Sequence, residues 1–128
     1  HDGVDAAEPV GISNESWEVS MNSEMLELSE MQAAAGQACR LMKVLANADR
    51  LMILCQLIGG ELSVGTLQGR LGLSQSALSQ HLARLRADRI VATRREGQTI
   101  FYRIIDPAAL QLLETLADLF CPPDMRSL

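Results

Sequence analysis

The sequence of 128 residues predicts a mainly helical fold with one small β-hairpin, an α+β fold, and three stretches carry this prediction. Apolar residues recur at helical spacing between residues 64 and 85 with one break at a glycine, which indicates two short helices joined by a tight turn. Two β-prone runs follow directly and are separated by turn residues. A helix pair continued by a hairpin is typical of a winged helix-turn-helix domain.

The helix pair is predicted over residues 64–71 and 74–86. In the first helix the apolar positions are three and four residues apart, at Val64, Leu67 and Leu71. Gly72 stands where this helix would end, at a position that favours a residue tolerant of positive φ. Ser74 is a favourable N-cap for the second helix, in which an inward stripe is expected at Leu78, Leu82 and Leu85.

The outer face of the second helix is rich in hydrogen-bonding side chains and poor in acids. Its members are Gln75, Ser76, Ser79, Gln80 and Arg84. Amides can bridge adenine, arginine can bridge guanine, and hydroxyls bind phosphates, so this set suits the major groove of DNA. The alternative is an ordinary solvated helix face, and the next twenty residues favour the DNA interpretation.

The hairpin is predicted from a strand over residues 90–94, a turn over 96–98 and a second strand over 99–105. Its tip is expected to carry Arg94, Arg95 and Gln98. A basic loop directly beyond a reading helix is typical of a wing, which contacts the sugar-phosphate backbone or the minor groove.

Charge is unevenly distributed along the chain. The overall net charge is −5, but residues 1–35 contain eight acidic residues and no Lys or Arg, so the remainder carries +3. Residues 70–103 contain seven arginines against Asp88 and Glu96, a net charge of +5. The local field near the helix pair and hairpin therefore suits a phosphate backbone despite the acidic total.

The rest of the chain predicts a tail and further helices. Residues 1–20 lack periodicity and are expected to be a disordered tail, which leaves residues 21–128 as the DNA-binding and dimerisation domain. Helices are expected from Ser23, over residues 36–46 and over residues 50–58. A last helix begins with the N-cap and proline of Asp106-Pro107 and stops at Cys121.

Two of these helices have apolar surface in excess. The N-terminal helix presents Met25, Leu28 and Met31, and the last helix presents Leu110, Leu112, Leu113, Leu116, Leu119 and Phe120. A second copy of the chain would cover both, so a homodimer is expected. Packing of the methionine-rich helix on the domain's own core is the alternative.

Other function classes receive little support. No apolar run approaches the roughly 18 residues needed to span a bilayer, and no N-terminal signal is recognisable, so a cytoplasmic protein without membrane contact is expected. An enzyme is not expected, because His81 is the one histidine beyond His1 and no catalytic cluster or phosphate-binding glycine loop is present. A winged-helix interaction module that does not bind DNA is a stronger rival, but the +5 segment argues against it.

Several linked motifs then point to one family. They are Leu45-Ala46-Asn47 with Arg50-Leu51-x-Ile53-Leu54, the stretch from Glu61 to Leu67, the stretch from Leu73 to Arg86, and the hairpin up to Tyr102. Over residues 31–121 the chain resembles the ArsR/SmtB bacterial repressors. The resemblance implies a homodimeric winged-helix repressor that binds operator DNA and releases it when an inducer binds.

Metal sensing, which many relatives perform, is not expected. Ser63 and Gly65 stand where the family's thiolate site has cysteines, and the last helix has no histidine. Zinc prefers about four Cys, His or carboxylate ligands. His81 is therefore interpreted as a phosphate contact or a packing residue, and no metal or other cofactor is expected.

The three cysteines, Cys39, Cys55 and Cys121, are each most simply small buried apolar residues. However, one cysteine in the helix before the turn and one closing the last helix is similar to the persulfide-responsive BigR, SqrR and HlyU branch. This resemblance implies that Cys55 and Cys121 form a disulfide or polysulfide bridge with reactive sulfur or oxidants, and that the repressor then leaves its operator. No role is assigned to Cys39, and two alternatives stay open: an HlyU-like antirepressor that displaces another silencer, and a metal-independent regulator with another inducer.

Overall fold

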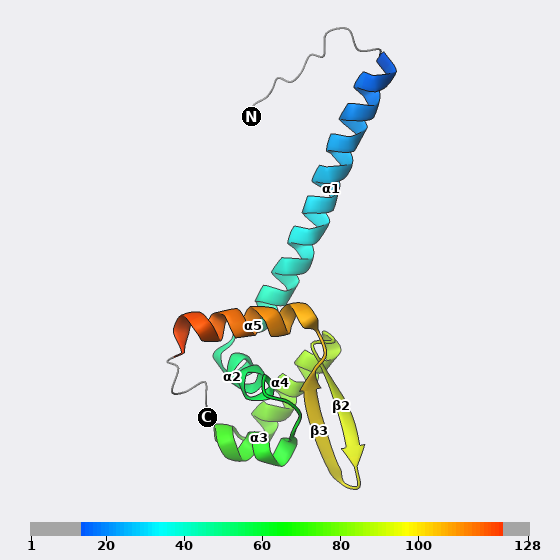
Figure 1. The fold of residues 1–128 in the computed structure, drawn as a ribbon. Helices are drawn as coiled ribbons and strands as arrows, with labels where there is room; N and C mark the ends of the chain where they lie inside the picture. The colour runs from blue at the N-terminus through cyan, green and yellow to red at the C-terminus, as the bar shows by residue number, and fades with distance from the viewer. Residues whose placement is uncertain (1–13, 122–128) are drawn as a thin grey trace. The chain divides into compact units, whose positions relative to one another are not determined.

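The computed structural model describes residues 14–121, whose five helices and three strands are shown in Figure 1. In chain order they are α1 (Asn14–Leu45), α2 (Ala48–Leu57), β1 (Leu62–Ser63), α3 (Val64–Leu71), α4 (Gln75–Ala87), β2 (Val91–Glu96), β3 (Thr99–Ile104) and α5 (Pro107–Phe120). The chain divides between Arg40 and Leu41 into two units, each of which is described by itself.

The first unit contains most of α1, a single helix of 32 residues. Two helices were expected here, starting at Ser23 and Gly36, and the structure joins them and begins nine positions before Ser23, at Asn14. Residues 14–20 thus differ from the predicted disordered tail, and residues 1–13 lie outside the described residues. Acidic residue types at 15 and 18 favour the start of a helix through its dipole, a signal that periodicity alone does not use.

The second unit begins with the last turn of α1, which is tied to α2. Asn47 caps α2, its side chain accepting a hydrogen bond from the Arg50 amide at 3.0 Å. The Arg50 guanidinium in turn donates from Nε to the Val44 carbonyl at 2.6 Å and so satisfies the C-terminal end of α1. The chain direction between the two helices is therefore fixed by local hydrogen bonds.

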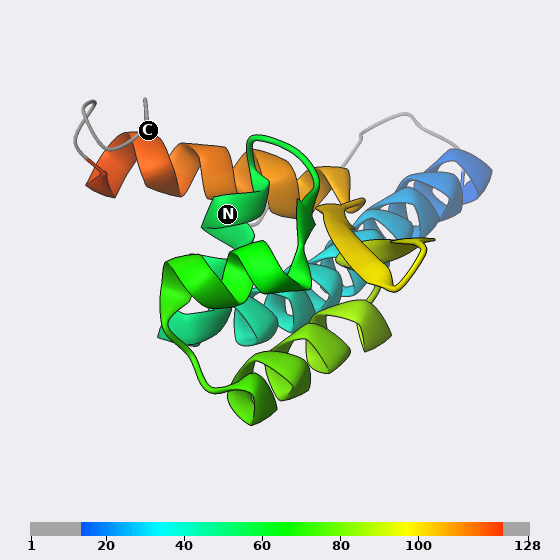
Figure 2. The same ribbon diagram turned by 90° about the horizontal axis from the view of Figure 1, so that it is seen from below.

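The helix-turn-helix forms as predicted, with α3 and α4 lying next to each other in Figure 2. Gly72 ends α3 with φ at 68°, the left-handed conformation that a glycine adopts without steric cost. Ser63 and Ser74 cap α3 and α4 by accepting from the amides of Thr66 and Ala77, both at 3.1 Å. The tight turn is thus specified by Gly72 and the Ser74 hydroxyl, whereas the Ser63 hydroxyl fixes the start of α3.

The hairpin belongs to a three-stranded antiparallel sheet with strand order β1-β3-β2. β1 has only two residues and was not predicted, because so short a strand has no readable alternation. The β2–β3 register pairs Glu96 with Thr99, which leaves Gly97 and Gln98 as the turn. Gly97 has φ at 64°, as the first central residue of a type II′ hairpin requires.

One apolar core joins these elements. The buried side chains are Val44, Leu45, Ile53, Leu54, Leu57, Leu67, Leu78, Leu82, Leu85, Ile90, Val91, Ala109 and Leu113. The predicted stripe of α4 is buried in full, and α5 contributes Ala109 and Leu113. The mainly helical α+β winged-helix fold is confirmed. No helix in the described part of the chain has the length and apolar character needed to cross a membrane.

Candidate DNA-binding face and cysteine pair

The predicted reading residues lie on the outer face of α4. Gln75, Ser76, Ser79, Gln80 and Arg84 are all exposed. The stripe that holds the helix in place, Leu78, Leu82 and Leu85, is buried on the opposite side. In Figure 2 α4 lies beside α3, with the hairpin next to its C-terminal half. The amides and hydroxyls of α4 are therefore available to a ligand on this side of the second unit.

His81 differs from the other reading residues because its side chain is only 18 % exposed. Its Nε2 lies 3.6 Å from a carboxylate oxygen of Asp49 in the first turn of α2. This position favours the packing interpretation of His81 over the phosphate contact.

Two of the predicted DNA-binding arginines have carboxylate partners within the protein. Arg84 donates from Nε to Asp88 at 3.0 Å, one helical turn further along α4. Arg94 donates to both oxygens of Glu61, from Nη2 to Oε1 at 2.7 Å and from Nε to each oxygen at 3.1 Å. The guanidinium carbon of Arg94 also lies 4.5 Å from the centre of the Phe101 ring.

The Glu61–Arg94 pair changes the ionisation of both partners. The hydrogen bond from Arg94 is the largest cause that lowers the pKa of Glu61, and the nearby charges of Arg94 and Arg103 lower it further. The same hydrogen bond raises the pKa of Arg94. Because Arg94 lies on β2 and Glu61 directly precedes β1, the pair links the hairpin to the segment after α2.

Of the three residues predicted at the hairpin tip, only Gln98 lies in the turn. Arg94 and Arg95 lie on β2, opposite Phe101 and Ile100 respectively. Arg95 is exposed and, among the residues that the structure describes, has no ion-pair partner. The free positive charge near the tip therefore belongs to Arg95.

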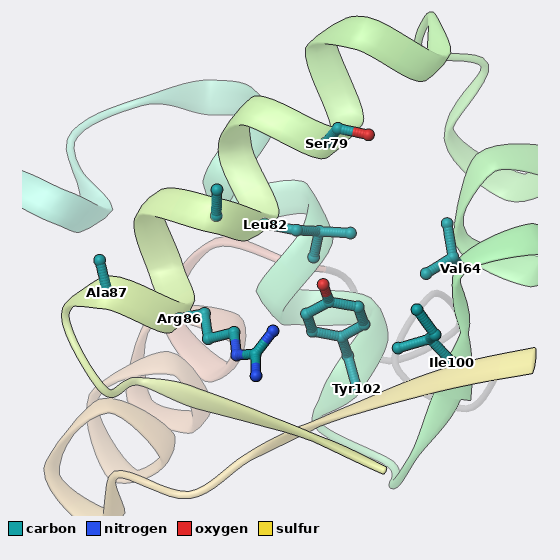
Figure 3. A pocket seen from close by; sticks show the side chains of 8 residues that line it. Val64, Ser79, Leu82, Arg86, Ala87, Ile100 and Tyr102 are labelled. Carbon is teal, nitrogen blue, oxygen red and sulfur yellow. The ribbon is translucent and has the colours of Figure 1, made fainter. Parts of the chain in front are cut away.

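A further arginine, Arg86, was counted in the basic segment but not predicted as a site residue. It lines an open groove of about 580 Å³ between α4, the start of α3 and β3, together with Ser79 and Tyr102 (Figure 3). Its position seven residues after Ser79 places both on one face of α4, which is the sequence signal that could have identified it.

Cys55 and Cys121 lie in the second unit, in the last turn of α2 and at the C-cap of α5. Both side chains are half-buried and both thiols are free. Burial raises the pKa of the Cys55 thiol, and the negative charge that Cys121 can carry raises it further. The two helices that carry these cysteines near their C-terminal ends, α2 and α5, pack against each other. Cys39 is exposed on the part of α1 that belongs to the first unit.

Metal ligands are not gathered anywhere in the described part of the chain, where no group of three or more His, Cys, Asp or Glu side chains could hold an ion.

Known proteins similar to this chain are transcriptional regulators. Residues 47–93, from the N-cap of α2 to the middle of β2, match the family described as bacterial regulatory protein, arsR family. The transcriptional activator HlyU of Vibrio cholerae is 50 % identical over 96 residues, which cover 75 % of this chain and 89 % of HlyU. The biofilm growth-associated repressor of Agrobacterium fabrum is 43 % identical over 99 residues, 77 % of this chain and 85 % of that protein.

Solved structures of the same branch share the fold. Reduced HlyU from Vibrio cholerae superimposes with a TM-score of 0.71 at 50 % identity and covers 73 % of this chain and 98 % of its own. The repressor BigR from Xylella fastidiosa gives 0.69 at 41 % identity, over 73 % of this chain and 96 % of its own. The relatives confirm the expectation that the chain is not an enzyme. The chain belongs to the ArsR family of DNA-binding bacterial transcriptional regulators and is similar to its HlyU and BigR members.

Proposed function

We propose that this protein is a dithiol-based repressor that binds operator DNA when reduced and leaves it when Cys55 and Cys121 become bridged. With a persulfide RSSH as oxidant, the two thiols and RSSH give the disulfide, the thiol RSH and H₂S, so the cysteines are oxidised and the persulfide sulfur is reduced. Peroxide would give the same disulfide and two molecules of water. Further persulfide equivalents would insert sulfur atoms and lengthen the bridge.

The observation that carries this proposal is the packing of α2, which holds Cys55 in its last turn, against α5, which ends at the C-cap residue Cys121. The two cysteines are 66 positions apart in the sequence, and a negative charge on Cys121 adds to the raised pKa of the Cys55 thiol. Both are half-buried, so a small reagent can reach them. A buried thiol deep in the core would not be expected to react.

A route from the bridge to the DNA-binding face runs through α2. This helix packs on α5 and also on α3 and α4. A bridge between Cys55 and Cys121 would fix the end of α2 to the end of α5. If the bridged form prefers another spacing of the two reading helices, a coupling of about 1 to 3 kcal/mol would weaken operator binding roughly 5- to 150-fold.

The DNA-binding half of the proposal uses a homodimer with two copies of α4 in successive major grooves, roughly 34 Å apart on an imperfect palindrome. Gln75 and Gln80 would read base edges, and Ser76, Ser79 and Arg84 would support them. Arg95 and Gln98 of the wing would contact the backbone or the minor groove. Arg94, held by Glu61, would act mainly by positioning the wing, and His81 mainly by packing.

The proposal is tested with DNA from upstream of the protein's own gene, by mobility shift and intact mass before and after exposure to polysulfide, peroxide and zinc. The reduced protein and the Cys39→Ser variant should release DNA after polysulfide treatment, with a loss of about 2 Da for a disulfide and about 32 Da added per further sulfur. Cys55→Ser and Cys121→Ser should bind DNA but not respond. A Cys121→Ser protein that dissociates normally after treatment refutes the cysteine pair.

The direction of regulation has a second candidate, because the relatives include both a transcriptional activator and repressors by name. An antirepressor would bind the same DNA and displace another silencer. Deletion of the gene separates the two: transcription from the bound promoter should rise for a repressor and fall for an antirepressor. A response to neither sulfur nor peroxide, with DNA binding intact, would favour another inducer.

A further inference from the structure

The groove between α4 and the hairpin has one charged lining residue, Arg86. The remaining lining is apolar or hydroxyl-bearing, with Leu82 and Ile100 on opposite walls and the hydroxyls of Ser79 and Tyr102 beside them. In Figure 3 the Arg86 guanidinium and the Tyr102 ring project from α4 and β3 into the same hollow. The groove thus combines one cation and two hydrogen-bond donors in a volume of about 580 Å³.

Arg86 can bind an anion without first breaking an ion pair, whereas two nearby arginines are already paired with carboxylates. Arg84 is paired with Asp88, and Arg94 is paired with Glu61. Arg86 has no carboxylate partner among the residues that the structure describes. An anion in the groove would therefore meet an uncompensated guanidinium, which forms strong charge-assisted hydrogen bonds with phosphate oxygens.

The position of the groove between the reading helix and the wing indicates which anion it binds. A reading helix in the major groove and a wing at the adjacent minor groove are separated by one sugar-phosphate strand, which must cross the space between helix and wing. In this protein that space, between α4 and β3, is the groove of Arg86. We propose that the groove binds one backbone phosphate of duplex DNA through Arg86, Ser79 and Tyr102. This inference rests on the DNA-binding half of the proposed function and is independent of the cysteines.

The first test is the salt dependence of binding to a labelled duplex, measured for Arg86→Gln and for Arg103→Gln as a matched control. Both substitutions remove one positive charge from each subunit. Arg103 directly follows Tyr102 on β3, so its side chain lies on the face of the sheet away from the groove, where it interacts with Glu61. Arg86→Gln should reduce the slope of log K against log salt by about 1.8 for the dimer, which is about 0.9 for the phosphate lost by each subunit, and should weaken operator and unrelated duplexes alike, each about tenfold per subunit. Arg86→Lys should restore most of the slope.

The second test locates the phosphate. Operator duplexes are prepared with a single neutral methylphosphonate at each backbone position in turn. One position per half-site, between the major-groove and minor-groove contacts, should weaken the wild type but not weaken Arg86→Gln further, because each change removes the same contact. Tyr102→Phe should show a smaller coupling at that position, and thermal unfolding confirms that each variant is folded.

Three outcomes of these measurements are distinguishable for the proposed phosphate site. A reduced slope for Arg86→Gln with coupling at one phosphate supports the groove. Equal slopes for Arg86→Gln, Arg103→Gln and the wild type, or no coupled position, overturn the groove while the proposed function stands. A wild-type protein that binds no duplex overturns both.

Discussion

At the scale of single residues, the contribution of an arginine depends on the carboxylates around it. Arg84, Arg86, Arg94 and Arg95 look equivalent in the sequence, yet within residues 14–121 two of them have a carboxylate partner and two do not. A paired guanidinium must give up its partner before it can bind a phosphate at full strength. The structure therefore divides the basic segment into cations that hold the protein together and cations that are free for DNA.

The Cys55 thiol is expected to ionise only at alkaline pH. In a Cys39→Ser/Cys121→Ser protein, the rate of iodoacetamide labelling should rise with pH through a midpoint above that of an unstructured peptide with the same sequence. Burial is the larger cause of the raised pKa of Cys55, and the neighbouring Cys121 is the smaller cause. Removing Cys121 should therefore lower the midpoint of Cys55 labelling only slightly, relative to the Cys39→Ser protein that retains Cys121. A midpoint equal to that of the peptide would show that burial is not the main cause.

The Glu61–Arg94 pair should make stability depend on acid pH. The folded state lowers the pKa of Glu61, so the pair stabilises the fold at neutral pH, above the pKa of the unfolded chain, and this stabilisation is lost as pH falls through the folded pKa. Glu61→Gln should therefore have a lower Tm than the wild type at pH 7, and the difference should shrink toward pH 3. Circular dichroism across this range measures it, and a Tm difference independent of pH would contradict the ion pair.

At the scale of residues, the sequence could predict those contacts whose two partners are close together along the chain. Gly72, Ser74 and Asp106 were predicted in their capping roles because a cap depends on neighbours three or four positions away. The Arg84–Asp88 pair also has readable helical spacing. The partner of Arg94 is 33 positions distant, and only the folded sheet shows that the two residues meet.

At the scale of elements, the four helices from α2 to α5 and the hairpin were predictable because each has a clear period, cap or turn residue. The two-residue strand β1 was not, since its existence depends on β3 lying alongside. The length of α1 was underestimated because residues up to 20 were interpreted as lacking periodicity, although Trp17 and Met21 continue the helical spacing of Met25 and Leu28 toward the N-terminus. Tertiary pairing and continuous helical backbone are the features that local patterns leave undetermined.

Ser74 and Ser76 provide a matched pair for testing the reading helix. The Ser74 hydroxyl accepts from the Ala77 amide at 3.1 Å, whereas Ser76 is exposed and proposed to face DNA. Ser74→Ala should lower the free energy of unfolding by about 1 kcal/mol. Ser76→Ala should leave unfolding within about 0.5 kcal/mol of the wild type and weaken operator binding. Urea unfolding measures the stability of each variant and a mobility shift measures its DNA binding. Equal stability of the two variants would show that the Ser74 hydroxyl does not stabilise α4.

At the scale of the whole molecule, exposed apolar surface predicts association of two copies. Met25, Leu28 and Met31 on α1 are 65, 56 and 66 % exposed, and Leu119 and Phe120 on α5 are 69 and 78 % exposed. Side chains of this kind gain roughly 1.5–3 kcal/mol each when fully buried. A homodimer that covers both helices accounts for this surface, as the winged-helix proposal requires for a palindromic operator.

The double substitution Leu119→Glu/Phe120→Glu tests the dimer. Both side chains are exposed within the chain, so the fold and its helix content should be retained, while carboxylates buried against a second copy would be strongly unfavourable. Sedimentation velocity should show a shift from dimer to monomer, and operator affinity should fall because the two half-sites are no longer bound together. Gln111→Glu, an added carboxylate at an exposed polar position of α5, serves as the control and should remain dimeric. A double variant that sediments as the wild type does would place the subunit contact elsewhere, and Leu28→Glu/Met31→Glu then tests α1 in the same way.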